Sequence, residues 1–327
     1  MKPGVAGEHL ALGPGAEFDR IRELARTLGE RARGLGDDCA LVSDLAGTLA
    51  LSTDVSVERV HFRLDWITAE EAGWRSAAVA LSDLAAEGAE AVGLLSAITV
   101  PERAAEADLT ALAAGIGDAA GAAGALVLGG DLSRGPAWSV AVTVVGLAQR
   151  PVTRAGARAG DGIWVTGALG GARAALEAWR RGDAPTPEAR HAYAHPEPRI
   201  QAGRWLAEHG AQAMLDLSDG LGADAGHLAA ASGVRIVLTL ETVPVAGAAV
   251  AEARRMDLPV QRFAAEGGDD YELLVALPAE FGDAGVRGFE SAAGIALTRV
   301  GTVAHGSGVR AELLGRVLEL RGYDHFR

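Results

Sequence analysis

Two patterns of apolar residues alternate along the chain. Short uninterrupted apolar runs are typical of buried strands, and longer segments with apolar residues three and four positions apart are typical of helices. In the first half, this pattern predicts strands at residues 48–51, 91–100, 125–128 and 138–147, and helices at 17–33, 68–87 and 102–123. The alternation of strands and helices predicts a mixed α/β fold.

The second half repeats the same style after a turn-rich join at residues 150–162. Strands are expected at 163–166, 213–217, 235–240 and 271–277, with two more near the end. Helices are expected from the end of the Gly-rich loop 167–171 to about 181, and at 200–209, 246–256 and 280–293. The segment 182–198 holds four prolines and is predicted to be a loop. We expect a flexible lead-in at 1–15, an amino-terminal domain at 16–148 and a carboxy-terminal domain at 149–327.

The start of the second predicted helix carries a specific signal. Thr68 and Glu71 form a capping-box pattern, in which each side chain bonds the backbone N–H of the other residue. In the later turns of this helix, Asp83 lies between Leu81 and Leu84 on an apolar face. A carboxylate is costly to bury there unless it is paired or bound to a metal, which favours a functional role for Asp83.

Composition narrows the possible partners. The 30 basic and 43 acidic residues give a net charge of −13, which repels nucleic acids and anionic membranes. No stretch approaches the roughly 20 apolar residues of a membrane span, and no signal-peptide pattern precedes residue 16. The single cysteine, Cys39, excludes an internal disulfide, and no zinc-site spacing is present. These features predict a cytoplasmic protein without nucleic-acid or membrane partners.

Lysine is almost absent from the sequence. The only one is Lys2, and the other 29 basic residues are arginines. A phosphate-binding-loop lysine or a protein-kinase strand lysine therefore cannot exist in the folded part of this chain. Any phosphate that the protein handles must be neutralised by metal ions and arginines.

Several aspartates are expected at the ends of predicted strands. Asp54, Asp131, Asp216 and Asp269 each lie close to an end of an apolar run, beside Gly, Ser or Thr, and Asp37 and Asp38 share a short loop. Aspartates without clustered His or Cys suit a hard cation such as Mg²⁺. For a single Gly-Asp pair, a simple turn is the alternative, and Asp216 and Asp219 are also candidate helix N-caps.

Two other features have ordinary alternatives. The loop 167–171 between strand and helix can hold phosphate on helix N–H groups, although it lacks the full Gly-x-Gly-x-x-Gly pattern and close packing explains it equally well. Arg154 is a candidate phosphate clamp or a solvated surface arginine.

Taken in order, these motifs resemble the thiamine-monophosphate kinase family, a branch of the superfamily of aminoimidazole ribonucleotide synthetase and selenophosphate synthetase. The matching stretches are Gly36-Asp37-Asp38-Cys39-Ala40, Ser52-Thr53-Asp54, His61-Phe62, Leu81-Ser82-Asp83-Leu84-Ala85-Ala86, Gly129-Gly130-Asp131, Leu215-Asp216-Leu217-Ser218-Asp219-Gly220-Leu221, Gly268-Asp269-Asp270-Tyr271-Glu272-Leu273 and Gly322-Tyr323-Asp324-His325-Phe326. The resemblance implies an amino-terminal sheet domain that forms a homodimer, a carboxy-terminal α/β domain, and ATP in the cleft between the domains.

The resemblance also implies roles for individual residues. The implied magnesium ligands are Asp37, Ser52, Thr53, Asp54, Asp83, Asp131, Asp216 and Asp219, of which Asp54, Asp83 and Asp131 are the catalytic set. The implied ATP contacts are Gly130, Asp131, Arg154 and Ser218, and the implied thiamine-monophosphate contacts are His61, Asp269 and Tyr323. The sequence departs from the family pattern where Asp269 replaces a Glu and Ala80 replaces an Asn, and also at Leu132 and Arg321.

The implied reaction needs few catalytic groups. Its acceptor is a phosphate oxygen that is already ionised near neutral pH, so no general base is required. Catalysis then depends on positioning the substrates and on several Mg²⁺ ions that neutralise their negative charge. The alternatives are another ATP-using synthetase or maturation enzyme of the superfamily and a non-catalytic Mg–nucleotide-binding protein. The absence of a reactive Cys before Gly36 argues against a selenophosphate synthetase.

Overall fold

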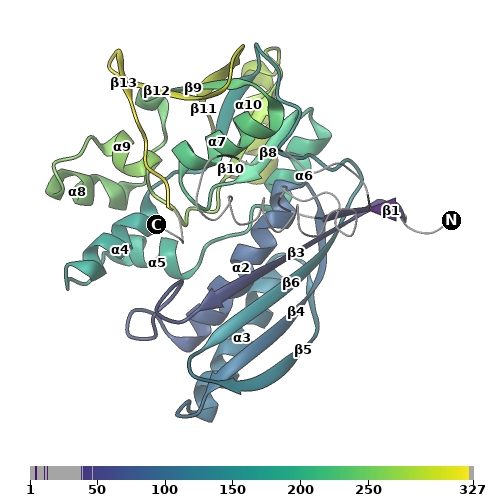
Figure 1. Cartoon of the computed structure of the whole chain (residues 1–327), viewed down its shortest axis with the longest axis vertical. Helices are drawn as coiled ribbons and strands as arrows, with labels where there is room; N and C mark the ends of the chain where they lie inside the picture. Colours follow the sequence, from purple (N-terminus) through teal and green to yellow (C-terminus); the bar gives the residue numbers. More distant parts are fainter. Residues whose placement is uncertain are drawn as a thin grey trace.

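The computed structural model describes residues 4–5, 11, 13, 38, 40–45 and 47–323 (Figure 1). It confirms the mixed α/β fold, with one sheet in each half of the chain. The predicted helix at 17–33, the candidate ligand Asp37 and the terminal residues 324–327 lie outside the described residues.

The first sheet has six strands in the order β1-β2-β3-β6-β4-β5. They are β1 (Gly4–Val5), β2 (Ala40–Leu45), β3 (Gly47–Val57), β4 (Glu90–Pro101), β5 (Leu126–Gly135) and β6 (Ser139–Ala148). Only β4 and β5 are parallel among these neighbours. Helices α2 (Ala69–Ala86) and α3 (Glu106–Ala122) cover one face of this sheet, and no helix of the described chain covers the other face (Figure 1).

Of the two described helices in the first half, α2 is the more buried. The predicted capping box is confirmed, because Thr68 Oγ1 accepts from the Glu71 N–H and Glu71 Oε2 accepts from the Thr68 N–H. All residues of α2 except Glu70, Trp74 and Asp83 are buried. The helix packs on β3 and β6 and on α3, and it also contacts elements of the second half, namely α5, α6 and β8. It therefore lies where the two halves meet.

Glycines allow α2 and α3 to approach closely. A Cβ atom added to Gly73 would lie 1.9 Å from the carbonyl oxygen of Leu112, and one added to Gly115 would lie 1.9 Å from that of Glu70. Each helix thus places a glycine against the backbone of the other. This close contact fixes the position of α2 over the sheet.

The second sheet has seven strands in the order β13-β12-β9-β11-β7-β10-β8. The strands are β7 (Gly162–Thr166), β8 (Ala213–Asp216), β9 (Arg235–Thr239), β10 (Leu273–Leu277), β11 (Leu297–Ala304), β12 (Gly308–Leu313) and β13 (Arg316–Leu318). The helices are α4 (Gly171–Arg180), α5 (Pro187–Ala194), α6 (Ile200–Glu208), α7 (Leu221–Ser232), α8 (Gly247–Arg255), α9 (Val260–Ala265) and α10 (Gly282–Ala293). None of the described helices combines the length and apolar character needed to cross a bilayer.

Three local predictions were wrong. Strand β3 continues through Ser52, Thr53 and Asp54, and β5 continues through Asp131, so these residues lie within strands and not at their ends. Pairing with β6 and β4 extends the strands beyond their apolar cores. The proline-rich segment 182–198 contains α5, because Thr186 caps the helix and Pro187 occupies its first turn, where proline is tolerated.

We predict that Gly115→Ala lowers the free energy of unfolding by about 1–3 kcal/mol, because the added methyl group collides with the α2 backbone. Gly117→Ala, in the same helix, is the control, since nothing lies within 4 Å of its added Cβ. It should raise the free energy of unfolding by about 0.5–1 kcal/mol through helix propensity. Urea unfolding of both variants tests this, and equal effects at the two positions would contradict the packing argument.

Candidate active site

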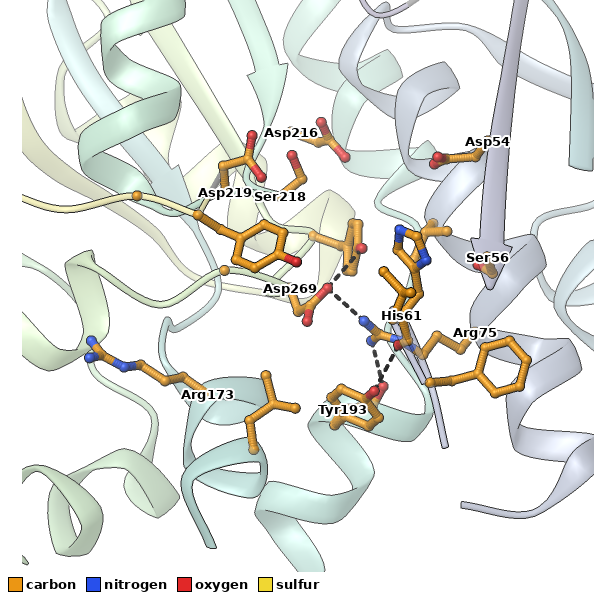
Figure 2. Close-up of a pocket in the computed structure, with 18 of the residues that line it drawn as sticks. Asp54, Ser56, His61, Arg75, Arg173, Tyr193, Asp216, Ser218, Asp219 and Asp269 are labelled. Carbon is orange, nitrogen blue, oxygen red and sulfur yellow. Dashed lines mark hydrogen bonds and ion pairs between the residues drawn. The ribbon is translucent and has the colours of Figure 1, made fainter. Parts of the chain in front are cut away.

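A cavity of about 1190 Å³ lies between the two halves of the molecule. Its walls come from β3 and the loop after it, from α2, from the loops that follow β8 and precede β10, and from the carboxy-terminal segment. Figure 2 shows that aspartates occupy one end of this cavity and that aromatic and arginine side chains occupy the other. We call these the acidic end and the arginine end.

The acidic end gathers carboxylates from three separate segments. Asp38, Asp83 of α2 and Asp216 at the end of β8 each place a carboxylate oxygen within 4.8 Å of the others. Ser52 Oγ donates to Asp83 Oδ2 at 2.5 Å, and Asp54 on the same face of β3 also lines the cavity. In Figure 2, Asp54 and Asp216 point toward the same space from opposite halves of the chain.

The negative charge on each of these carboxylates makes ionisation of the others less favourable. Burial and the neighbouring Asp216, Asp54 and Asp38 raise the pKa of Asp83 well above its ordinary value. Burial and Asp38 raise the pKa of Asp216 to about 7. Arg154 partly compensates this charge, because its Nε and Nη2 atoms donate to the two oxygens of Asp38 at 2.9 and 2.5 Å. Arg154, predicted to contact ATP, lines the cavity and binds a carboxylate there.

Hard divalent cations fit the acidic end. The donor atoms are carboxylate and hydroxyl oxygens, and the spacing between them suits a shared ion. A bound cation would also offset the repulsion that contributes to the raised pKa values of Asp83 and Asp216. Asp38, Asp83 and Asp216 would hold Mg²⁺, with Asp54 beside them. The family resemblance implied Asp37 as a ligand in this loop. Asp37 lies outside the described residues, and among the described ones its neighbour Asp38 belongs to the cluster.

A second group of titratable side chains adjoins the acidic end. Asp219, Asp224 and His227 also lie within 4.8 Å of one another, and Asp224 Oδ2 accepts from the Asp219 N–H. Sequence reasoning missed Asp224 and His227. Their signal was available, because they lie three residues apart on α7 directly after the Asp-Leu-Ser-Asp-Gly motif.

The three predicted substrate residues share the cavity with the acidic end. His61, Asp269 and Tyr323 all line the cavity. Asp269 has φ of 67° and Tyr271 has φ of 51°, a backbone region that is unfavourable for a bulky residue such as Tyr. Hydrogen bonds from the N–H groups of Asp269 and Tyr271 to the carbonyl oxygens of Ser218 and Leu217 hold this loop in place. The predicted nucleotide residue Ser218 thus supports the predicted substrate residue Asp269.

Several predicted site residues lie away from the acidic cluster. Gly130 and Asp131 are exposed on β5, and no residue of this strand is among the described residues that line the cavity. A Cβ on Gly130 would lie 2.0 Å from the Ser96 carbonyl oxygen, so strand packing requires this glycine. Thr53 is among the residues that line the cavity, but its side chain projects from β3 on the side opposite to Ser52, and its hydroxyl lies 2.8 Å from Thr143 Oγ1.

The Gly-rich loop before α4 is already bound by a carboxylate. Asp270 accepts from the Gly170 N–H at 2.9 Å, and burial raises the pKa of Asp270 well above its ordinary value. Gly170 has φ of 89° and packs against Ala264. Close packing and the hydrogen bond to this internal carboxyl group therefore account for the loop, which supports the structural alternative over phosphate binding.

Comparison with known proteins agrees with this fold and site. The family "AIR synthase related protein, N-terminal domain" matches residues 36–148, and "AIR synthase related protein, C-terminal domain" matches residues 158–313. The chain is therefore an AIR synthase related protein. The hydrogenase maturation protein HypE of E. coli has the same fold, with a TM-score of 0.70 at 20% identity over 83% of this chain and 84% of that one.

More similar relatives narrow the family. The thiamine-monophosphate kinase of Mycobacterium tuberculosis H37Rv is 37% identical over 266 residues, 80% of each chain, and that of Aquifex aeolicus is 32% identical over 95% of this chain and 98% of its own. The solved structure of AaThiL complexed with AMPPCP and TMP superposes with a TM-score of 0.86 at 32% identity, covering 95% of this chain and 97% of that one. This chain belongs to the thiamine-monophosphate kinase family.

The acidic end predicts a pH dependence of stability in the metal-free protein. Since folding raises the pKa of Asp216 to about 7, the folded state holds this proton more tightly than the unfolded chain. The carboxyl therefore destabilises the fold increasingly as pH rises from about 4 to about 7, and by a constant amount above that. We expect Asp216→Asn to be more stable than the wild type at about pH 8 by as much as a few kcal/mol, and to lose this advantage near pH 4.

Urea unfolding in EDTA across this pH range measures the effect. Asp118→Asn, which changes an exposed aspartate of α3, is the control and should follow the wild type. If Asp216→Asn showed no gain in stability above neutral pH, the proposed repulsion among the buried carboxylates would be wrong.

Proposed function

We propose that this protein transfers the γ-phosphoryl group of ATP to thiamine monophosphate, which gives ADP and thiamine diphosphate. The observation that carries the proposal is a cluster of three carboxylates, among which Asp83 and Asp216 have raised pKa values, at one end of a cleft that the predicted substrate residues also line. Membership of the thiamine-monophosphate kinase family, and the AMPPCP and TMP complex of AaThiL, support the choice of both substrates.

The chemistry matches what the cavity offers. An oxygen of the acceptor phosphate attacks the γ-phosphorus while the bond from that phosphorus to the ADP oxygen breaks, so no proton has to leave the nucleophile. Magnesium ions, when bound, neutralise the anions that approach each other. Asp38, Asp83 and Asp216 would hold these ions, and Asp54 lies beside them. The residues of the chain then have only to bind and orient the two substrates.

His61, Asp269 and Tyr323 are proposed to bind thiamine monophosphate. Tyr323 reaches the cavity because its N–H donates to the Asp219 carbonyl oxygen at 3.1 Å, and its ring is half exposed. An aromatic ring and a carboxylate suit the cationic thiazolium of thiamine. We place this activity in the cytoplasm, as the single cysteine suggests.

We predict that the purified wild type converts thiamine monophosphate to thiamine diphosphate with ATP and Mg²⁺, and that Asp83→Asn lowers kcat by more than about a hundredfold. Losses of ten- to a hundredfold are typical even of residues that only support metal ligands. Product can be quantified by chromatography. Asp118→Asn should retain wild-type activity, and Asp269→Glu should have a mild effect. Absence of product from the wild type would contradict the function, and full activity of Asp83→Asn would contradict the metal site.

We also infer that the first sheet pairs with a second copy of the chain. Its uncovered face and its edge strand β5 expose large apolar side chains, which are Val55, Val92, Leu95, Leu126, Val127, Leu128 and Leu132. Contiguous apolar surface of this kind marks an interaction site. Asp131 pairs in register with Ala97 of β4 and faces this surface beside Leu95, which places it toward the second copy and away from its own cavity.

Leu95→Asp should convert the dimer to a monomer, because it places a charge at the centre of the paired surface. Val317→Asp is the control, since Val317 is similarly exposed but lies on β13 of the other sheet. Size-exclusion chromatography with light scattering distinguishes the two states. A monomeric wild type, or an unchanged dimer for Leu95→Asp, would rule out this interface.

A further inference from the structure

A buried arginine links the two predicted substrate residues His61 and Asp269. Arg75 of α2 has 5% of its side chain exposed, and its Nη2 donates to Asp269 Oδ1 at 2.6 Å. Its Nη1 donates to the carbonyl oxygen of Tyr193 at 2.8 Å, and its guanidinium stacks on the Tyr193 ring with the Cζ atom 4.1 Å from the ring centre. The hydroxyl of Tyr193 in turn donates to the His61 carbonyl oxygen at 2.8 Å. Figure 2 shows this chain of contacts across the cavity wall.

We propose that Arg75 and Tyr193 are positioning residues for thiamine monophosphate, and that Arg75 sets the orientation of Asp269. This inference rests on the proposed function. It concerns two residues outside the site predicted from sequence, and it assigns them to the substrate end of the cavity and not to the nucleotide.

The geometry at Asp269 carries the argument. Both Arg75 and the Tyr271 hydroxyl, at 3.0 Å, donate to the same oxygen, Oδ1. Oδ2 accepts no hydrogen bond from the part of the chain that the structure describes, although Asp269 lines the cavity and 27% of its side chain is exposed. The two donors therefore fix the plane of the carboxylate and leave one oxygen for a ligand. The sequence has Asp269 where the family has Glu, so the side chain that carries this carboxylate is short. Arg75 then determines the direction in which the carboxylate points.

Charge explains why an arginine suits this place. An unpaired Asp269 would repel the phosphate of a substrate as it enters the cavity, whereas the Arg75–Asp269 pair has no net charge and still presents a carboxylate oxygen to the substrate ring. The planar guanidinium bonds Asp269 and the Tyr193 carbonyl while stacking on the ring of Tyr193, and a lysine ammonium would lose the stacked geometry.

Steady-state kinetics of Arg75→Met test the proposal. We expect the KM for thiamine monophosphate to rise by about ten- to a hundredfold, as is typical when a hydrogen bond to a charged group is lost. The KM for ATP should change less than about twofold, because Arg75 does not contact the acidic end. Arg75→Lys should restore part of the loss. Tyr193→Phe, which removes only the hydroxyl bond to His61, should raise the same KM by a smaller factor.

The matched control is Arg190→Met. Arg190 also pairs α5 with α2, through both oxygens of Glu71, but it does not line the cavity. It should lower the melting temperature without changing either KM. If Arg75→Met behaved like Arg190→Met, or raised both KM values equally, Arg75 would be a structural link and the proposal would be overturned.

A double-mutant cycle tests whether Arg75 acts through Asp269. In an Asp269→Asn background, Arg75→Met should raise the KM for thiamine monophosphate by much less than in the wild type. Additive effects would overturn the positioning role. A wild type that fails to phosphorylate thiamine monophosphate would overturn the proposed function itself, whereas an active wild type with additive effects would overturn only this inference.

Discussion

The structure depends on bringing like charges together against their repulsion. Asp38, Asp83 and Asp216 come from segments far apart in the sequence, yet their oxygens lie within 4.8 Å of one another. Nothing in the carboxylates favours this arrangement, since burial and the neighbouring carboxylates raise the pKa values of Asp83 and Asp216. The packing around them must supply the free energy that holds them.

Helix α2 supplies much of that packing. Its small residues allow close contact with α3 on one side, and its C-terminal half packs on α6, where a Cβ on Gly203 would lie 1.9 Å from the Ala85 carbonyl oxygen. The helix carries Asp83 to the acidic end and Arg75 to the arginine end, eight residues or about 12 Å apart along its axis. One rigid element therefore sets the distance between the metal-binding and substrate-binding ends of the cleft. A shift of α2 would disturb both ends at once.

The sequence predicted the elements better than the site geometry. The spacing of apolar residues and the capping box at Thr68 were enough to predict the position of α2, because both are local signals in the sequence. Asp83 was also predictable, since a carboxylate between two buried leucines needs a partner. The positions of Asp54 and Asp131 within strands were not predictable, because strand pairing decides where a polar strand ends. Arg75 gave no local signal either. Its role depends on Tyr193, 118 residues away, and on Asp269, 194 residues away.

The two ends of the cavity manage charge in opposite ways. At the acidic end, three carboxylates share one arginine, Arg154, so the site favours cations from solution. At the arginine end, Arg75 and Asp269 neutralise each other, and recognition depends on the direction of a hydrogen-bonding oxygen and on aromatic surface. A substrate with an anionic phosphate and a cationic ring matches this division, because its phosphate is drawn toward the bound cations while its ring meets a wall without net charge. The near absence of lysine fits the same division. Planar arginines hold the paired carboxylates, and metal ions carry the mobile positive charge.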